Sequence, residues 1–113
     1  MTFDPESSLP QEEVDEQVTR AIEDNEVVLF MKGTPVMPQC GYSDRALNLI
    51  EQHREEFETV DVLESLEEYR EALEAHSGWE TMPQTFVDGE FVGGSDVLAE
   101  LQERGELGAT LNA

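Results

Sequence analysis

The chain has 113 residues, 38% of them hydrophobic, which is enough for one compact domain and too short for two. Its 27 acidic residues against 6 basic ones give a net charge of −21, which repels phosphate backbones and anionic lipids and argues against nucleic-acid and membrane-surface roles. No stretch approaches the roughly 20 apolar residues of a membrane span, and residues 1–10 lack the basic and apolar regions of a secretory signal.

The acidic excess is spread along the chain and is not gathered into one tail, which argues against a disordered acidic segment. We interpret the charge as a halophilic adaptation to a salty cytoplasm, where a Debye length of about 3 Å at 1 M salt removes most of the self-repulsion. The chain has a single cysteine, so it forms no internal disulfide, and this fits a reducing cytoplasm.

The first half of the chain predicts a helix, a strand, a second helix and a second strand. Residues 1–10 are expected to be a flexible lead-in, and residues 11–24 predict an amphipathic helix because their apolar side chains recur at helical spacing. The five apolar residues 27–31 predict a strand buried on both faces, and residues 57–62 predict a second, short strand. A helix that runs to about Arg54 separates them, so the two strands should be parallel.

The second half predicts a helix over residues 63–77, stopped by Gly78, and then two antiparallel strands at 84–87 and 90–92. The strands are joined by Asp88-Gly89, a pair typical of a type I′ turn.

A last helix should be capped by Ser95 or Asp96 and closed by Gly105. The sum is an α/β fold, a four-stranded mixed sheet flanked by helices on both faces. We expect the domain to span residues 11–107, followed by a short tail at 108–113.

Cys40 is the first candidate for chemistry. It follows a loop with two prolines and falls at the start of the second helix, where unpaired N–H groups and the helix dipole favour a thiolate. Lys32, the only lysine, ends the strand before it and adds a cation. The alternative is that Cys40 is a small buried hydrophobic residue, but its neighbours Pro38, Gln39, Gly41 and Ser43 form a polar, turn-like setting that does not resemble a core.

Other candidates weigh less. His53 and His76 lie far apart in sequence with no second cysteine nearby, so we expect solvated helix-end histidines and no zinc site. Trp79 is expected to be a packing residue beside the Met82-Pro83 turn.

Four motifs in this order resemble those of the monothiol glutaredoxins of the thioredoxin superfamily. They are Lys32-Gly33-Thr34-Pro35, Pro38-Gln39-Cys40-Gly41-Tyr42-Ser43, Gly78-Trp79-Glu80-Thr81-Met82-Pro83-Gln84 and Asp88-Gly89-Glu90-Phe91-Val92-Gly93-Gly94-Ser95-Asp96. The similarity extends from about Val14 to Leu107, and it implies a thioredoxin-like fold.

The resemblance also implies roles for residues. Cys40 resembles the family's active thiol, and Lys32 the cation beside it that also meets a carboxylate of glutathione. Met82-Pro83 matches the family's cis-proline, whose extended backbone hydrogen-bonds the cysteinyl part of the tripeptide. A second group, expected to hold the two ends of glutathione, consists of Gly94, Ser95 and Asp96 for the γ-glutamyl end and Arg70 for the glycine carboxylate.

Two positions depart from the family pattern. Tyr42, which the resemblance also places among the residues that bind the thiol, stands where the family usually has phenylalanine; the change keeps the ring and adds a hydroxyl. Glu80 stands where proline is common, which places a carboxylate near an anion-binding groove.

One cysteine followed by Ser43 leaves no second thiol to resolve a mixed disulfide within the chain. The resemblance implies a carrier that binds a [2Fe-2S] cluster in a cluster-bridged homodimer, with glutathione or another low-molecular-weight thiol as co-ligand, and passes it to apo iron–sulfur proteins. The alternatives are a glutathione-dependent thiol–disulfide oxidoreductase that uses Cys40, and a non-enzymatic redox or iron-sensing adaptor.

Overall fold

The central strand β1, Val27–Met31, is buried at all five positions, as its continuous apolar sequence predicts. The computed structural model describes residues 8–113, so the first seven positions of the expected lead-in lie outside the described residues. Ser8 and Leu9 already contact the domain, because the Leu9 N–H donates to Ser65 Oγ at 3.0 Å and its side chain packs on the core.

The sheet has four strands in the order β2-β1-β3-β4. Strand β2, Glu58–Asp61, is parallel to β1, whereas β3, Gln84–Val87, and β4, Glu90–Gly93, add antiparallel strands on the other side. This confirms the predicted mixed sheet. The turn at Asp88-Gly89 has positive φ at both residues (52° and 83°), as a type I′ turn requires.

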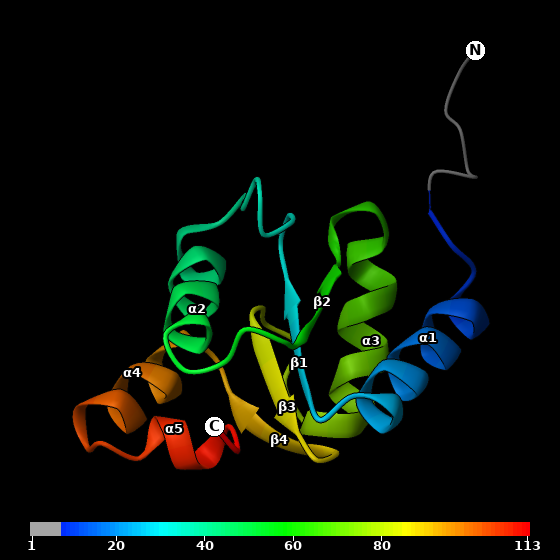
Figure 1. Cartoon of the computed structure of the whole chain (residues 1–113). Helices are drawn as coiled ribbons and strands as arrows, with labels where there is room; N and C mark the ends of the chain where they lie inside the picture. The colour runs from blue at the N-terminus through cyan, green and yellow to red at the C-terminus, as the bar shows by residue number, and fades with distance from the viewer. Residues whose placement is uncertain (1–7) are drawn as a thin grey trace.

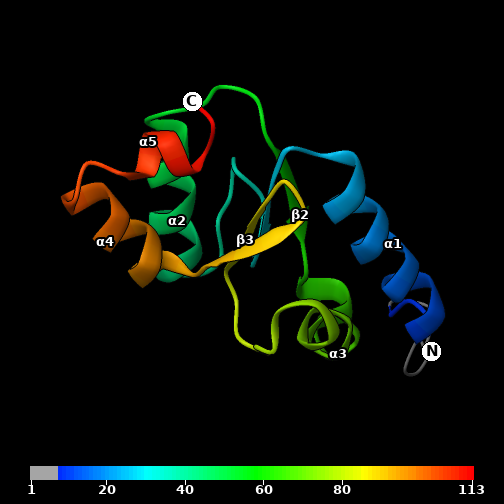
Figure 2. The same ribbon diagram turned by 90° about the horizontal axis from the view of Figure 1, so that it is seen from below.

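Helices cover both faces of the sheet, which Figure 1 shows side-on and Figure 2 from below. Alternate side chains of β1 point to opposite faces, so Val28 and Phe30 enter one core and Val27, Leu29 and Met31 the other. The first core is closed by α1, Gln11–Asp24, and α3, Leu66–Ser77; the second is closed by α2, Gly41–Glu51, α4, Ser95–Glu103, and α5, Leu107–Thr110. None of the helices among residues 8–113 is long and apolar enough to span a membrane.

The helix predicted over residues 63–77 is divided in the structure. Leu63–Ser65 form a 3-10 turn and α3 begins at Leu66. The Asp61 carboxylate accepts the Leu63 N–H at 3.0 Å, which fixes the entry to this turn. Gly78 ends α3 in the left-handed conformation, with its N–H bonded to the carbonyl of Glu74, as predicted.

The C-terminal segment differs from the short tail expected at residues 108–113. Leu107–Thr110 form α5, and both Leu107 and Leu111 are fully buried in the second core. The signal was present in the sequence, because two leucines four residues apart lie on one face of a helix.

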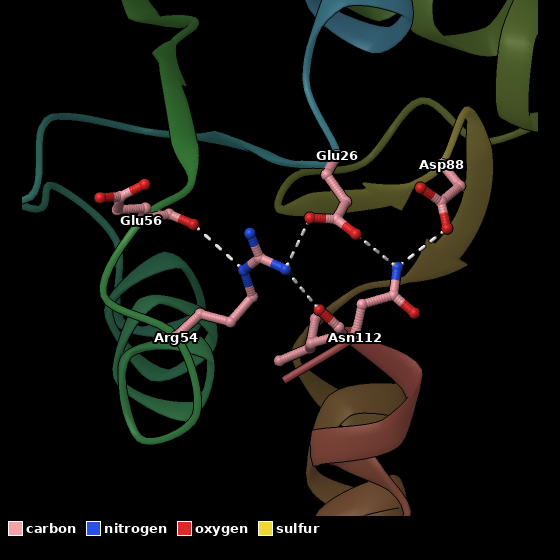
Figure 3. A network of polar contacts seen from close by, with 6 residues as sticks. Glu26, Arg54, Glu56, Asp88 and Asn112 are labelled. Carbon is pink, nitrogen blue, oxygen red and sulfur yellow. Dashed lines mark hydrogen bonds and ion pairs between the residues drawn. The ribbon is translucent and has the colours of Figure 1, made fainter.

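A polar network fixes this segment to the rest of the domain (Figure 3). The Arg54 guanidinium donates to Glu26 Oε1 at 3.0 Å and to the Leu111 carbonyl at 2.9 Å. Asn112 Nδ2 donates to Glu26 Oε2 at 3.1 Å and to Asp88 Oδ2 at 2.9 Å. The network therefore joins the end of the chain to the start of β1, the β3–β4 turn and the segment after α2.

Candidate functional site

Cys40 is the N-cap residue of α2. Its backbone is extended (φ −151°, ψ 132°), and its carbonyl accepts the Asp44 N–H at 2.9 Å as the first helical bond. The side chain is partly exposed. The thiol thus lies where the sequence predicted it, beside the unpaired N–H groups of the first helical turn.

Several groups act on the charge of the Cys40 sulfur. Burial of the side chain raises the pKa of the thiol, but the N–H groups of Ser43 and Tyr42, the Ser43 hydroxyl and the charge of Lys32 together lower it below its ordinary value. The sulfur makes no capping hydrogen bond of standard geometry, so the N–H groups stabilise the thiolate as dipoles directed toward it. The predicted influence of the helix N-terminus and Lys32 is present in the structure.

The contacts of Ser43 were not predicted from the sequence, which indicated only a serine that cannot be oxidised. It is fully buried, and its Oγ accepts the Lys32 N–H at 3.0 Å. Its hydroxyl proton remains available to the Cys40 sulfur. One side chain therefore connects the strand that carries the lysine to the helix that carries the thiol.

The loop from Gly33 to Gln39 leads from β1 to the cysteine. The Gly33 N–H donates to the Asp61 carboxylate at 3.0 Å, and the Gln39 N–H returns to the Lys32 carbonyl at 2.9 Å. Gly33 has φ 96°, a conformation that favours glycine. At the tip, the Val36 side chain is 94% exposed.

A groove of about 570 Å³ lies beside the cysteine. It is bounded by the first turn of α2, the segment before β3, strand β4 and the first turn of α4. Six of the residues predicted for thiol binding line it together: Tyr42, Met82, Pro83, Gly94, Ser95 and Asp96. The Met82-Pro83 peptide bond is cis, as the resemblance implies.

The other three predicted site residues do not line this groove. Cys40 is two residues before Tyr42, which lines the groove, and the charge of Lys32 lowers the pKa of the Cys40 thiol. Arg70 lies on α3 and donates to Glu67 Oε2 at 2.8 Å within its own helix.

The start of α4 differs in one detail from the prediction that Ser95 or Asp96 caps it. Gly94 is the N-cap, and Ser95 is the first helical residue and is buried. A Cβ at Gly94 would lie 3.1 Å from the Pro83 carbonyl oxygen, a tight contact, so glycine favours the close approach of the two groove walls. Asp96 remains exposed at the rim, with Oδ1 3.6 Å from Arg45 Nη1.

Trp79 was expected to pack beside the proline turn. Its side chain is instead 58% exposed and lines the groove. Only its backbone is used to support the turn, since the Trp79 carbonyl accepts Gln84 Nε2 at 2.9 Å.

Residues 8–113 contain no group of three or more histidine, cysteine, aspartate or glutamate side chains that could hold a metal ion. His53 bonds to Gln102 at 2.8 Å, and His76 to Thr19 at 3.3 Å. Cys40 is the one thiol in the sequence.

Comparison with known proteins agrees with this geometry. The glutaredoxin family pattern matches residues 27–92. The chain is 42% identical over 92 residues to an uncharacterised monothiol glutaredoxin of Porphyra purpurea, a match that covers 81% of this chain and 85% of that protein. It is 43% identical over 111 residues to a bifunctional chloroplast monothiol glutaredoxin of Arabidopsis thaliana, covering 95% of this chain but 36% of that longer protein.

A solved structure, the reduced apo form of a poplar glutaredoxin, superimposes with a TM-score of 0.75 at 37% identity and covers 88% of this chain and 90% of its own. The family match over residues 27–92 includes β1, α2 and the Met82-Pro83 segment of this chain. The chain belongs to the glutaredoxin family, among its monothiol members.

Proposed function

We propose that this chain carries a [2Fe-2S] cluster in a cluster-bridged homodimer, with glutathione as co-ligand, and transfers it to apo iron–sulfur proteins in the cytoplasm. The observation that carries the proposal is the combination at Cys40 of a lowered thiol pKa, partial exposure and an adjacent groove with room for a small thiol. A thiolate is the form that ligates iron, so a lowered pKa favours ligation.

The ligand count supports a dimer. A [2Fe-2S] cluster is held by four ligands, usually thiolates. One chain has one cysteine, and its described residues offer no other group of metal ligands. Two chains supply two thiolates, and two small thiols complete the set.

The chemistry of the groove suits glutathione. Its cis-proline segment offers extended backbone to the cysteinyl part, as the family resemblance implies. Gly94, Ser95 and Asp96 place the unpaired N–H groups of a helix N-terminus beside a carboxylate, a combination that suits an α-amino acid. Arg70 bonds to Glu67, so we assign the glycine carboxylate to Lys32 and leave Arg70 a lesser role.

The cluster is the cargo in this proposal, and partial exposure of Cys40 suits its release. A ligand at a helix N-terminus on the surface can exchange with the thiols of an acceptor without opening of the core.

Anaerobic reconstitution with iron, sulfide and glutathione in molar KCl tests the proposal, with absorption and solution mass as readouts. We expect a coloured dimer whose colour requires both glutathione and Cys40, so Cys40→Ser should remain a colourless monomer. The coloured protein should then transfer its cluster to an apo-ferredoxin. A colourless wild-type monomer with every small thiol tested would contradict the proposal.

A second function, glutathione-dependent disulfide exchange, is favoured by the same lowered pKa. The Cys40 thiolate would attack the glutathione sulfur of a protein–glutathione disulfide, release the protein thiolate and form a Cys40–glutathione disulfide. The thiolate of a second glutathione would then attack that disulfide, giving oxidised glutathione and the Cys40 thiolate. Turnover of a glutathionylated peptide, with Cys40→Ser as control, measures this activity independently of the cluster.

A further inference from the structure

Arg45, which none of the motifs includes, lies next to Asp96, a residue that lines the groove. It is on the second turn of α2, and its Nη1 is 3.6 Å from Oδ1 of Asp96, which lines the groove at the start of α4. The two side chains therefore connect helices that are far apart in sequence, next to the helix N-terminus assigned to the γ-glutamyl end of the thiol.

The contact between them is weak. The Arg45 and Asp96 side chains are 53% and 89% exposed, and 3.6 Å is too long for a hydrogen bond. Exposed ion pairs of this kind contribute little to stability, so a ligand can separate the two charges at little cost.

Arg45 also differs from the other arginines. Arg20, Arg54, Arg70 and Arg104 each donate a hydrogen bond to a carboxylate at 2.7 to 3.3 Å. Arg45 alone makes no such bond to a described residue, so its planar set of N–H donors is available for a carboxylate in the groove.

We propose that Arg45 binds the α-carboxylate of the small thiol while Asp96 binds its α-ammonium, so that the pair selects thiols with a free α-amino acid end. This inference rests on the proposed function and adds a determinant of specificity to it. A zwitterion placed between opposite charges satisfies both of them. Arg45 also offsets the repulsion that a chain of net charge −21 exerts on an anionic ligand.

The test compares two thiols that differ only in the α-carboxylate: glutathione, and 4-aminobutanoyl-cysteinyl-glycine, which lacks it. For each small thiol, the protein is mixed with the symmetric disulfide of that thiol. The Cys40 thiol and this disulfide equilibrate with the mixed disulfide at Cys40 and one molecule of the free small thiol. Mass spectrometry of the protein gives the equilibrium constant. A substitution that changes the Cys40 pKa affects both equilibrium constants equally, so their ratio is independent of that change. About 0.1 M KCl keeps the Debye length near 10 Å, so charges are not fully screened.

We expect Arg45→Gln to lower the glutathione constant roughly threefold to tenfold and the constant of the analogue less than twofold. The control is Arg104→Gln, which removes the same charge from an exposed pair with Glu100 in the last turn of α4 and should change neither constant. If Arg45→Gln lowered the equilibrium constants of both thiols equally, or lowered neither, the role of Arg45 would be overturned.

The wild-type chain separates this inference from the proposed function. If it forms the mixed disulfide with glutathione no better than with 2-mercaptoethanol, the groove does not recognise the tripeptide and both proposals fail. If it prefers glutathione and Arg45→Gln keeps that preference in full, only the role of Arg45 fails.

Discussion

At the residue scale, the reactivity of this protein depends on what surrounds one sulfur atom. Partial burial opposes the thiolate, whereas a helix N-terminus, the Ser43 hydroxyl and the Lys32 charge stabilise it. The stabilising groups prevail, so the thiol pKa is lowered. The Ser43 hydroxyl is the one of these that a single substitution removes without changing the charge or the helix.

Replacing Ser43 with alanine should raise the pKa of Cys40, because the thiolate loses a hydrogen-bond donor. Alkylation by iodoacetamide follows the thiolate, so its rate at pH 7 should fall roughly twofold to fivefold and should equal the wild-type rate at high pH. Ser77→Ala is the matched control, because the Ser77 hydroxyl donates to the Leu73 carbonyl on α3. This substitution should leave the dependence of the alkylation rate on pH unchanged. A Ser43→Ala profile that overlays the wild type would refute the role of the hydroxyl.

At the element scale, two irregular segments determine the shape of the site and the stability of the domain. The loop from Gly33 to Gln39 places Cys40, and it depends on a glycine with positive φ. The C-terminal segment closes the second core, and it depends on the polar network of Arg54. Each segment also makes a hydrogen bond to a distant part of the chain, Gly33 to Asp61 and the Leu111 carbonyl to Arg54.

Gly33→Ala should destabilise the protein by about 2 kcal/mol or more and displace the loop. The added Cβ would lie 2.6 Å from the backbone of both Met37 and Gln39, and φ 96° is unfavourable for alanine. Urea unfolding at pH 7 measures the loss. Gly41→Ala is the control, because its Cβ would meet no atom within 4 Å and should change stability by less than about 1 kcal/mol.

Arg54→Gln should cost about 1–3 kcal/mol, because it removes charged hydrogen bonds to Glu26 and to the Leu111 carbonyl from a side chain that is only 17% exposed. Arg104→Gln breaks an exposed pair and should cost less than about 0.5 kcal/mol in the same unfolding experiment. Equal costs for the two substitutions would mean that the network does not hold the C-terminal segment.

At the scale of the whole molecule, the main feature is the charge. Five ion pairs are present among residues 8–113, one for each arginine, so most of the 27 acidic residues have no cationic neighbour. Such a surface repels itself in dilute buffer and is screened in concentrated salt. This is the physical basis of the proposed halophilic adaptation.

The melting temperature should rise by at least about 5 °C from dilute buffer to molar KCl, the shift that about 1 kcal/mol of relieved repulsion gives a domain of this size. NaCl at equal ionic strength should give the same rise, since screening does not depend on the cation. A melting temperature that stays constant or falls in both salts would reject the adaptation.

Much of the fold was predictable from local patterns. Helix α1 and strands β1 and β3 have the predicted bounds, since each is a periodic or continuous apolar segment with clear ends. The errors concern features that local patterns specify weakly. One is α5, whose single helical turn is stabilised by the burial of Leu107 and Leu111.

The sequence also predicted most of the residues that the structure brings together at the groove, because its motifs carry the thiol, the lysine, the cis-proline and the helix N-terminus together. What it could not predict were contacts between distant segments. Two examples are the hydrogen bond from the Lys32 N–H to Ser43 and the pair of Arg45 with Asp96. The exposure of Trp79 was also not predicted.

By itself, then, the sequence determined the order and type of the main elements, the single thiol and the large negative charge, because propensity, periodicity and composition act locally or additively. Only the tertiary structure decided which side chains meet at the groove, that the C-terminal residues complete a core and that Arg70 stays with Glu67. Such contacts depend on how the helices pack across the sheet, and packing is a property of the whole chain.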